Sequence, residues 1–191
     1  MTLALFALVQ PAQARPWGPP PGRIFIATLE TSLGNIRCML RHETAPETVR
    51  AFVELARGKR AWTDPVTGAQ TRRPLYDGTI FHRVIPEFMI QGGDPLGDGT
   101  GGPGYTLPDE AAATSRFDRS GMLAMANHGP DTGGSQFFIT EVPVPYLDGK
   151  HTVFGECGNE EVIRRIAGTA RDQQDRPNTP VVLKKVTITV E

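Results

Sequence analysis

Five short stretches of the chain mix large apolar side chains with arginine, glutamine, asparagine and histidine. They span residues 81–83, 88–94, 125–127, 135–139 and 147–151. Because residues two apart on a strand point to the same face, Arg83 shares a face with Phe81, and Gln136 shares one with Phe138. Such faces form the wall of an apolar pocket that carries a few polar groups to orient a ligand. Taken one at a time, the apolar residues also fit an ordinary hydrophobic core.

Other motifs that could carry chemistry fail on their context. Residues 97–102 match the GxGxxG spacing of a dinucleotide-binding turn, but Pro103 and Pro108 follow where a helix would have to begin. A calcium loop would need a glutamate where Tyr105 stands, and Ser135 lacks the second glycine of a nucleophile elbow. The four histidines are scattered and do not cluster with the two cysteines. We therefore expect no metal ion and no cofactor.

The overall composition is that of a soluble, globular protein. The chain has 191 residues, with 20 lysines and arginines against 21 aspartates and glutamates, and a formal charge of −1. This length predicts a single domain that can bury a core without disulfides. The even charge balance argues against a nucleic-acid partner, because binding phosphates needs an excess of basic residues. The 21 glycines and 17 prolines favour short strands joined by tight turns.

The N-terminal residues differ from the rest of the chain. Residues 3–9 form an unbroken apolar run, which is far shorter than the roughly 20 residues of a membrane-spanning helix. The tripeptide AQA at 12–14 follows, with the small-x-small spacing of a signal-peptidase site. No basic residue precedes Arg15, so a start further upstream or an apolar N-terminal strand is the alternative. We predict a signal peptide at 1–14, a proline-rich leader at 15–22 and one domain at 23–191.

Hydrophobic periodicity predicts mostly strands. We expect strands over 23–30, 35–40, 79–84, 88–91, 121–126, 136–140 and 152–156, and a last strand with Val186, Ile188 and Val190 on one face. Helices are expected from Pro46 to a stop at Gly58, and over 160–167 with Asn159 as N-cap. The polar segment 57–75 is expected to be a solvated loop. Seven or eight short strands with two helices favour a closed antiparallel barrel over an α/β sandwich.

The chain has two cysteines, Cys38 and Cys157. An even number is compatible with one disulfide in an oxidising compartment. Both cysteines, however, stand in strands with alternating apolar residues, where a thiol also fills core space well. A disulfide needs Cβ atoms about 4 Å apart, and nothing in the sequence shows that these two approach. We expect two free, buried thiols.

Four longer segments carry a resemblance to a known family. They are FHRVIPEFMIQGGD (81–94), GTGGPGY (99–105), GMLAMANHGPDTGGSQFFIT (121–140) and LDGKHTVFGE (147–156). With these segments the chain resembles the cyclophilin family of peptidyl-prolyl cis-trans isomerases, of the bacterial kind, from about residue 23 to the C-terminus. The resemblance implies a mainly β fold, a closed eight-stranded antiparallel barrel capped by two α-helices. It also implies that the protein is an enzyme that accelerates rotation about X–Pro bonds.

The resemblance assigns roles to individual residues. It implies that Arg83 is the catalytic arginine. It implies that the substrate is held by Phe88, Met89, Gln91, Ala126, Asn127, Gln136, Phe138, Tyr146, Leu147 and His151. Two positions depart from the family pattern. Tyr146 stands where the family often has a tryptophan that contacts cyclosporin-type ligands, and Glu87 stands where glycine is common, which we interpret as a tolerated loop change.

The chemistry of this reaction explains why the sequence needs no acid, base or metal. Rotation about an X–Pro bond breaks amide resonance without breaking a σ bond, and it takes tens of seconds unaided. At the top of the barrier the proline nitrogen gains a free lone pair, so a donor aimed at it binds the transition state best. A guanidinium suits this role because it is rigid and always charged. An apolar cup around the ring would exclude water.

The resemblance also implies the partners. We expect proline-containing polypeptide clients whose folding the protein assists, weakened binding of cyclosporin-type ligands, and a monomer without nucleic-acid partner or stable membrane insertion. With the predicted signal peptide, we expect export to the periplasm, and a cytoplasmic protein is the alternative. A proline-binding module in which catalysis is incidental is a second function, which the presence of Arg83 disfavours. A carbohydrate-binding barrel would need exposed tryptophans, whereas Trp17 and Trp62 fall in the leader and the 57–75 segment.

Overall fold

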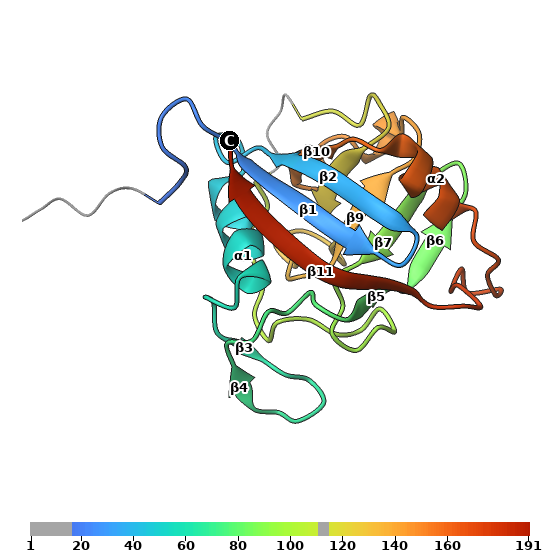
Figure 1. Cartoon of the computed structure of the whole chain (residues 1–191), viewed down its shortest axis with the longest axis horizontal. Helices are drawn as coiled ribbons and strands as arrows, with labels where there is room; N and C mark the ends of the chain where they lie inside the picture. The colour runs from blue at the N-terminus through green and yellow to red at the C-terminus, as the bar shows by residue number, and fades with distance from the viewer. Residues whose placement is uncertain (1–16, 111–114) are drawn as a thin grey trace, which may run out of the picture.

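The computed structural model describes residues 17–110 and 115–191. The predicted signal peptide at 1–14 and the first two residues of the predicted leader lie outside the described residues. Figure 1 shows strands wrapped around a common core, with helices α1 and α2 on opposite sides of them. At the described end of the leader, the ring of Trp17 packs against Phe25, with 5.3 Å between ring centroids. In the described ranges, no helix has both the length and the apolar character needed to cross a membrane.

Nine strands form one antiparallel sheet, in the order β5-β11-β1-β2-β10-β8-β9-β7-β6. The strands are β1 (Phe25–Thr31), β2 (Gly34–Leu40), β5 (Thr79–Phe81), β6 (Arg83–Ile85), β7 (Met89–Gly92), β8 (Met122–Met125), β9 (Phe137–Thr140), β10 (Val153–Cys157) and β11 (Val181–Val190). The two outer strands of this order, β5 and β6, are separated along the chain by His82 alone. The chain passes directly from β5 to β6 and so nearly closes the sheet into a barrel. The barrel has nine strands where eight were predicted, because the strand expected over 79–84 is interrupted at His82.

Helix α1 (Pro46–Ala56) starts with proline, whose missing N–H is not needed in the first turn. It buries Val49, Phe52 and Val53 in the barrel core. The Phe52 ring lies 4.8 Å from that of Tyr76 and 5.8 Å from that of Phe137. The helix therefore ties the core to β9, which also carries residues of the predicted site.

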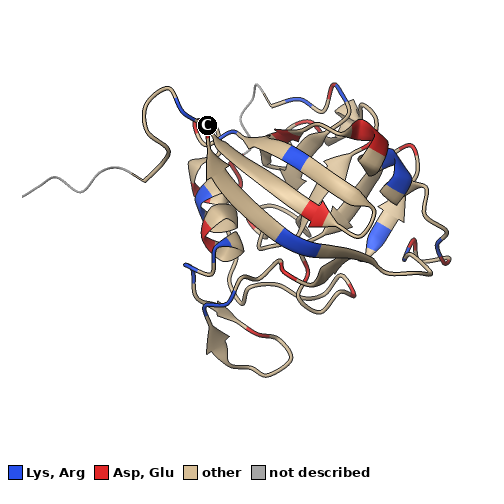
Figure 2. Ribbon diagram, in the orientation of Figure 1, with Lys and Arg blue, Asp and Glu red and all other residues tan. Residues whose placement is uncertain are grey.

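Helix α2 (Glu160–Ala167) has the predicted bounds. It has acidic residues in its first turn and basic ones, Arg164 and Arg165, in its last, as the helix dipole favours (Figure 2). The predicted N-cap was wrong in one respect. Asn159 occupies the N-cap position, but it has a left-handed φ of 61° and its side chain makes no capping hydrogen bond. The tight turn from β10 sets this conformation, and the sequence alone does not show it.

The segment 57–75 is not a plain solvated loop. It contains a hairpin of β3 (Trp62–Thr63) and β4 (Gln70–Thr71). The Trp62 side chain is 1% exposed, its Nε1 donates to the Arg73 carbonyl at 2.9 Å, and the Arg73 guanidinium lies 4.7 Å above the ring. Strands of two residues are too short to show a periodic pattern, so the sequence analysis did not predict them. With Trp62 buried, the hairpin presents no tryptophan to a carbohydrate.

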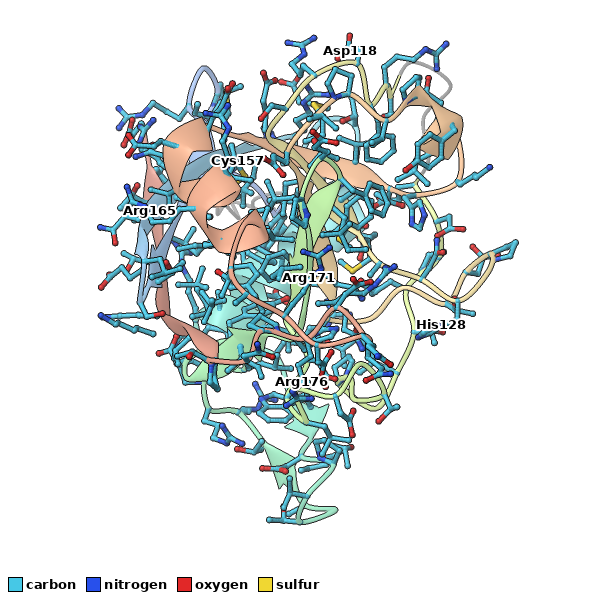
Figure 3. The ribbon with its side chains drawn as sticks, turned by 90° about the vertical axis from the view of Figure 1, so that its right-hand side faces the viewer. Asp118, His128, Cys157, Arg165, Arg171 and Arg176 are labelled. Atoms are coloured by element: carbon cyan, nitrogen blue, oxygen red, sulfur yellow. A yellow bond between two sulfur atoms is a disulfide. The ribbon has the colours of Figure 1, made fainter. Side chains whose placement is uncertain are left out.

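Two loops at one end of the strands flank the predicted site. The first joins α2 to β11 and carries Arg171 and Arg176, and the second carries His128 after β8 (Figure 3). A short 3-10 helix, η1 (Pro145–Leu147), lies between β9 and β10. The loops come from distant parts of the chain, and the barrel brings them together.

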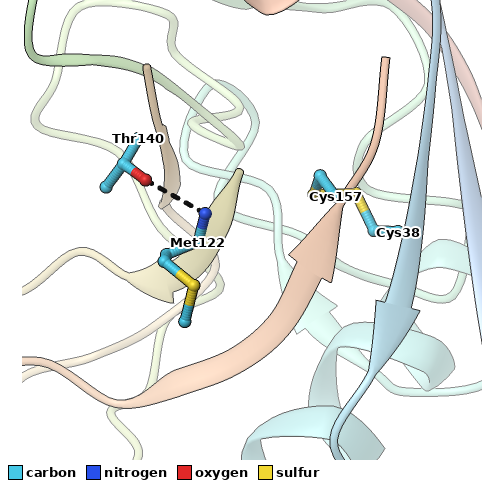
Figure 4. Close-up of a disulfide and its surroundings, with 4 residues drawn as sticks. All are labelled: Cys38, Met122, Thr140 and Cys157. Atoms are coloured by element: carbon cyan, nitrogen blue, oxygen red, sulfur yellow. Dashed lines mark hydrogen bonds between the residues drawn. A yellow bond between two sulfur atoms is a disulfide. The ribbon is translucent and has the colours of Figure 1, made fainter. Parts of the chain in front are cut away.

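The prediction of free thiols is wrong, because Cys38 and Cys157 form a disulfide (Figure 4). Cys157 at the end of β10 pairs directly with Cys38 of β2, and the Cα atoms are 3.9 Å apart. The two cysteines are 119 residues apart in the sequence. Their approach depends on the register between β2 and β10, which the sequence of each strand does not determine. The bond joins two adjacent strands of the barrel wall.

Candidate active site

The site begins with a row of residues that cross four neighbouring strands. Arg83 of β6 lies opposite Gln91 of β7, Gln91 lies opposite Phe138 of β9, and Phe138 lies opposite Ala124 of β8. Residues directly opposite on antiparallel strands project to the same face. Met89 lies two residues before Gln91 and so shares this face. The register therefore places a guanidinium, an amide and two apolar side chains side by side.

These side chains line a cavity of about 540 Å³, which we term the main cavity. Its lining includes nine of the eleven predicted site residues: Arg83, Phe88, Met89, Gln91, Ala126, Asn127, Phe138, Leu147 and His151. Met89 and Phe138 are buried and contribute to its apolar floor, and the Arg83 side chain is 44% exposed. Phe138 stacks on Phe117 behind it, with 5.7 Å between ring centroids. The arrangement is an apolar floor beside one accessible cation.

Gln136, a predicted site residue, does not line the main cavity but holds its wall. Its Nε2 donates to the carbonyls of Gly99 at 3.0 Å and Gly101 at 2.9 Å, and its Oε1 accepts a hydrogen bond from Gln91 Nε2 at 3.0 Å. Because Gln136 is almost fully buried and uses both ends of its amide, Gln91 is held in one orientation.

The glycine-rich run at 97–102 folds around one buried carboxylate. Asp94 accepts backbone hydrogen bonds from Leu96 at 2.8 Å, Asp98 at 3.1 Å and Gly99 at 2.6 Å. A Cβ atom on Gly101 would overlap with Asp94 Oδ1, so only glycine fits there. No helix begins within this run. The run instead shapes the wall that Gln136 holds.

A second cavity of about 390 Å³ adjoins the main one. It shares Gln91, Ala126, Asn127 and His128 with the main cavity, and it adds Gln136 and the segment Thr100 to Thr106. The shared residues lie between the two cavities.

Two histidines that are at least partly buried, His82 and His151, line the main cavity. Burial lowers the pKa of His82 below 6.5, against the opposing effect of the nearby Asp94 carboxylate. Burial also lowers the pKa of His151, against the hydrogen bond between its Nδ1 and the Met125 carbonyl at 3.1 Å. The His151 ring stands edge-on to Phe138, with 5.1 Å between centroids. Both imidazoles are therefore neutral near pH 7. In the described ranges, no cluster of three metal-ligating side chains could hold a metal ion.

Comparison with known proteins agrees with this geometry. The family model for cyclophilin-type peptidyl-prolyl cis-trans isomerases matches residues 26–188. The chain is 52% identical over 166 residues to peptidyl-prolyl cis-trans isomerase B of Streptomyces anulatus, which covers 85% of this chain and 95% of that protein. It is 48% identical over 165 residues to peptidyl-prolyl cis-trans isomerase A of Mycobacterium tuberculosis, with 85% and 91% covered. The chain belongs to the cyclophilin family.

Solved cyclophilins share the fold. A crystal structure of a Cryptosporidium parvum cyclophilin-type isomerase matches with a TM-score of 0.75 at 31% identity, covering 87% of this chain and 98% of that one. A second structure of that protein, determined in the presence of the dipeptide Ala-Pro, matches with a TM-score of 0.74. The predicted barrel and the predicted enzyme class, a peptidyl-prolyl cis-trans isomerase, are both confirmed.

Tyr146 and Glu87, which the sequence analysis set apart, both adjoin Phe88, a residue that lines this cyclophilin's main cavity. Tyr146 is 60% exposed on η1, and its ring packs against Phe88 with 6.1 Å between centroids, but it does not line the cavity. Glu87 has a left-handed φ of 59°, and its N–H donates to Glu141 Oε2 at 2.7 Å. Glycine adopts such a conformation more easily than glutamate. We therefore expect glutamate at this position to cost some stability, which the sequence did not indicate.

Five further residues line the main cavity of the cyclophilin without having been predicted. They are His82, Asp98, Gly99, His128 and Gln174. His82, Gly99 and His128 lie within segments that carried the resemblance, so their position in those segments was a usable signal, whereas Asp98 falls between two of the segments. Gln174 comes from the loop between α2 and β11, which has no motif. Its place at the site depends on how that loop packs against β6.

Proposed function

We propose that Arg83 stabilises the twisted transition state of X–Pro rotation while the proline ring occupies the main cavity. One observation carries this proposal. Arg83 is an exposed guanidinium beside a floor of Met89 and Phe138, in a row set by strand register. A donor in this place can follow the proline nitrogen as it becomes pyramidal, because the ring itself stays fixed in the cavity.

The rest of the site orients the peptide. Asn127 Nδ2 donates to the Lys150 carbonyl at 3.0 Å, which ties the Ala126–His128 edge to the loop that carries His151. Gln91 is held by Gln136 from the other side. Contacts to the peptide backbone on both sides of the proline would let one side of the bond rotate while the other stays bound. The apolar floor excludes water that would compete for the guanidinium.

The clients that follow from this site are flexible or unfolded chains. The main cavity accepts a proline ring and selects little else, so we propose that the protein assists folding wherever X–Pro isomerisation limits the rate. We propose further that it acts as a monomer. Gel filtration with light scattering tests this, and a stable dimer contradicts it.

Replacement of Arg83 tests the mechanism. In a protease-coupled assay of an X–Pro peptide, Arg83→Ala should lower kcat/KM by roughly 10²–10³-fold, as expected when one transition-state donor is removed. Arg83→Lys should recover little, because a point charge on a flexible stem does not reproduce the planar fork. Peptide binding should persist in both variants, as measured by titration. An unchanged rate in Arg83→Ala refutes the mechanism and favours a binding module in which catalysis is incidental.

We also propose that the protein works outside the cytoplasm, in the periplasm. The Cys38–Cys157 disulfide supports this, because disulfides persist in oxidising compartments. The AQA tripeptide at 12–14 supports it from the sequence. Mass spectrometry of the protein from its native cell should find a chain that begins after Ala14, with the two cysteines bonded. An intact Met1 on the abundant form refutes export.

A further inference from the structure

The loop between α2 and β11 places a carboxylate against the arginine of the proposed mechanism. Asp175 Oδ2 lies 3.8 Å from Arg83 Nε, and Asp175 Oδ1 accepts a hydrogen bond from Arg171 Nε at 3.1 Å. Across the described ranges, Asp175 is the one acidic residue that forms an ion pair with Arg83. The two oxygens of one carboxylate are thus divided between two guanidinium groups.

The loop that carries Asp175 is firmly built. Asp172 Oδ1 accepts hydrogen bonds from the N–H groups of Gln174 at 2.9 Å and Arg176 at 3.0 Å, and Asp175 N–H donates to the Asp172 carbonyl at 3.1 Å. Asp175 itself has a left-handed φ of 63°. A non-glycine residue keeps such a conformation when its surroundings impose it, and these residues often occur at active sites. The carboxylate is therefore presented from a fixed backbone.

A second contact fixes the loop to the strand of Arg83. The N–H of Val84, the next residue of β6, donates to the Asp175 carbonyl at 2.8 Å. Gln174, one residue earlier in the loop, lines the main cavity. Figure 3 shows Arg171 and Arg176 on this loop, in front of the strands. Backbone and side chain of Asp175 thus reach Val84 and Arg83, so the loop cannot move without moving the arginine.

The contact involves the inner nitrogen of the guanidinium. Asp175 lies 3.8 Å from Nε, which is an ion-pair separation longer than a hydrogen bond. The attraction between the two charges favours the side-chain rotamers of Arg83 that keep its planar guanidinium beside Asp175. An arginine with a 44% exposed side chain would otherwise sample several rotamers.

We propose that Asp175 is a positioning residue, which orients the Arg83 guanidinium for the transition state of X–Pro rotation. This inference rests on the proposed function of Arg83. The carboxylate acts on Arg83 and not on the substrate. It limits the rotamers that Arg83 samples in the free enzyme, so that less conformational entropy is lost when the guanidinium binds the pyramidal proline nitrogen. Asp175 then contributes to catalysis from a loop that carries no motif.

The test is Asp175→Asn, which keeps the shape of the side chain and removes its charge. We expect kcat/KM to fall about two- to fivefold, the range of an exposed ion pair. The loss should fall on kcat, measured by exchange NMR at saturating peptide, while KM stays within twofold because the cavity floor is unchanged. Arg171→Gln is the matched control, since it breaks the other ion pair of Asp175 and leaves the one to Arg83. Its kcat should stay within twofold of the parent.

A double-mutant cycle separates this inference from the proposed function. If Asp175 acts through Arg83, Asp175→Asn should have no further effect in the Arg83→Ala background. The inference is overturned if Asp175→Asn leaves kcat unchanged or raises it. It is also overturned if the same loss appears in the Arg83→Ala background or in Arg171→Gln. If Arg83→Ala alone retains the parental rate, the proposed function fails instead. Thermal unfolding of each variant confirms that it is folded.

Discussion

The two adjoining cavities are built in different ways. Side chains that project from β6, β7 and β9 form much of the main cavity, and strand register places them. Backbone forms much of the second cavity, along the glycine-rich segment that is folded around Asp94 and held by Gln136. The comparison teaches how each cavity can be altered. The main cavity changes when one of its side chains is replaced, whereas the second cavity changes when a side chain is added to one of its glycines.

The largest effect should come from adding a methyl group in the glycine-rich segment. Gly101→Ala should lower the free energy of unfolding by about 3 kcal/mol. The added Cβ would displace the buried Asp94 carboxylate from the backbone N–H groups that donate hydrogen bonds to it. Gly102→Ala is the matched control, since its Cβ would meet no atom within 4 Å, and it should change stability by less than about 0.5 kcal/mol. Urea unfolding measures both. Equal losses would break the comparison.

A change beside the main cavity should act on ligand affinity instead. Tyr146→Trp should strengthen binding of a cyclosporin-type peptide by about 10- to 100-fold, because the larger ring adds contact area and the indole N–H adds a donor. The turnover of small proline peptides should change little, since Tyr146 does not line the cavity. Titration of the ligand against both proteins gives the ratio. Equal affinities would show that this side chain does not determine sensitivity.

Glu87 tests the backbone beside the same cavity. Glu87→Gly should raise the free energy of unfolding by about 0.5–1 kcal/mol. Glycine relieves the left-handed conformation at φ 59°, and its extra freedom in the unfolded chain offsets part of the gain. Glu87→Ala is the control, because it removes the carboxylate and keeps the strained backbone, so it should not stabilise. If alanine stabilises as much as glycine, the gain comes from removing the charge.

The smallest effect concerns the buried histidines of the main cavity. Burial lowers the pKa of His82 and of His151 below 6.5. Below about pH 6.5 these histidines bind protons in the unfolded chain before they do so in the folded chain. The free energy of unfolding therefore decreases as the pH is lowered, until the pH is below the folded-state pKa values. Urea unfolding between about pH 7 and 5 measures how the free energy of unfolding depends on pH. This dependence should be weaker in the double variant His82→Gln/His151→Gln than in the parent. An unaltered dependence in the double variant would contradict the assignment.

Much of the fold could be predicted because it depends on spacing along the chain. The alternation of residues around Arg83 and Gln136 indicates strands, and the apolar spacing at 160–167 indicates the helix that is found there. The hairpin at Trp62 was missed, because its strands are only two residues long. Local patterns thus predict an element when it spans a few periods, and fail when it does not.

By itself the sequence determined the residue types of the site and, within an unbroken strand, the faces that they share. The expectation that Arg83 shares a face with Phe81 was wrong, because His82 separates β5 from β6, and Phe81 is buried in the core while Arg83 lines the main cavity. Period-two spacing follows from the covalent geometry of an extended chain, so Phe138 and Gln136, or Met89 and Gln91, share a face wherever their strand lies. The tertiary structure decided which strands are neighbours. It brought Cys38 to Cys157, Gln136 to the carbonyls of the glycine-rich segment, and Asp175 to Arg83. These contacts join residues more than 30 positions apart, and they depend on barrel closure and strand register, which arise from packing of the whole core.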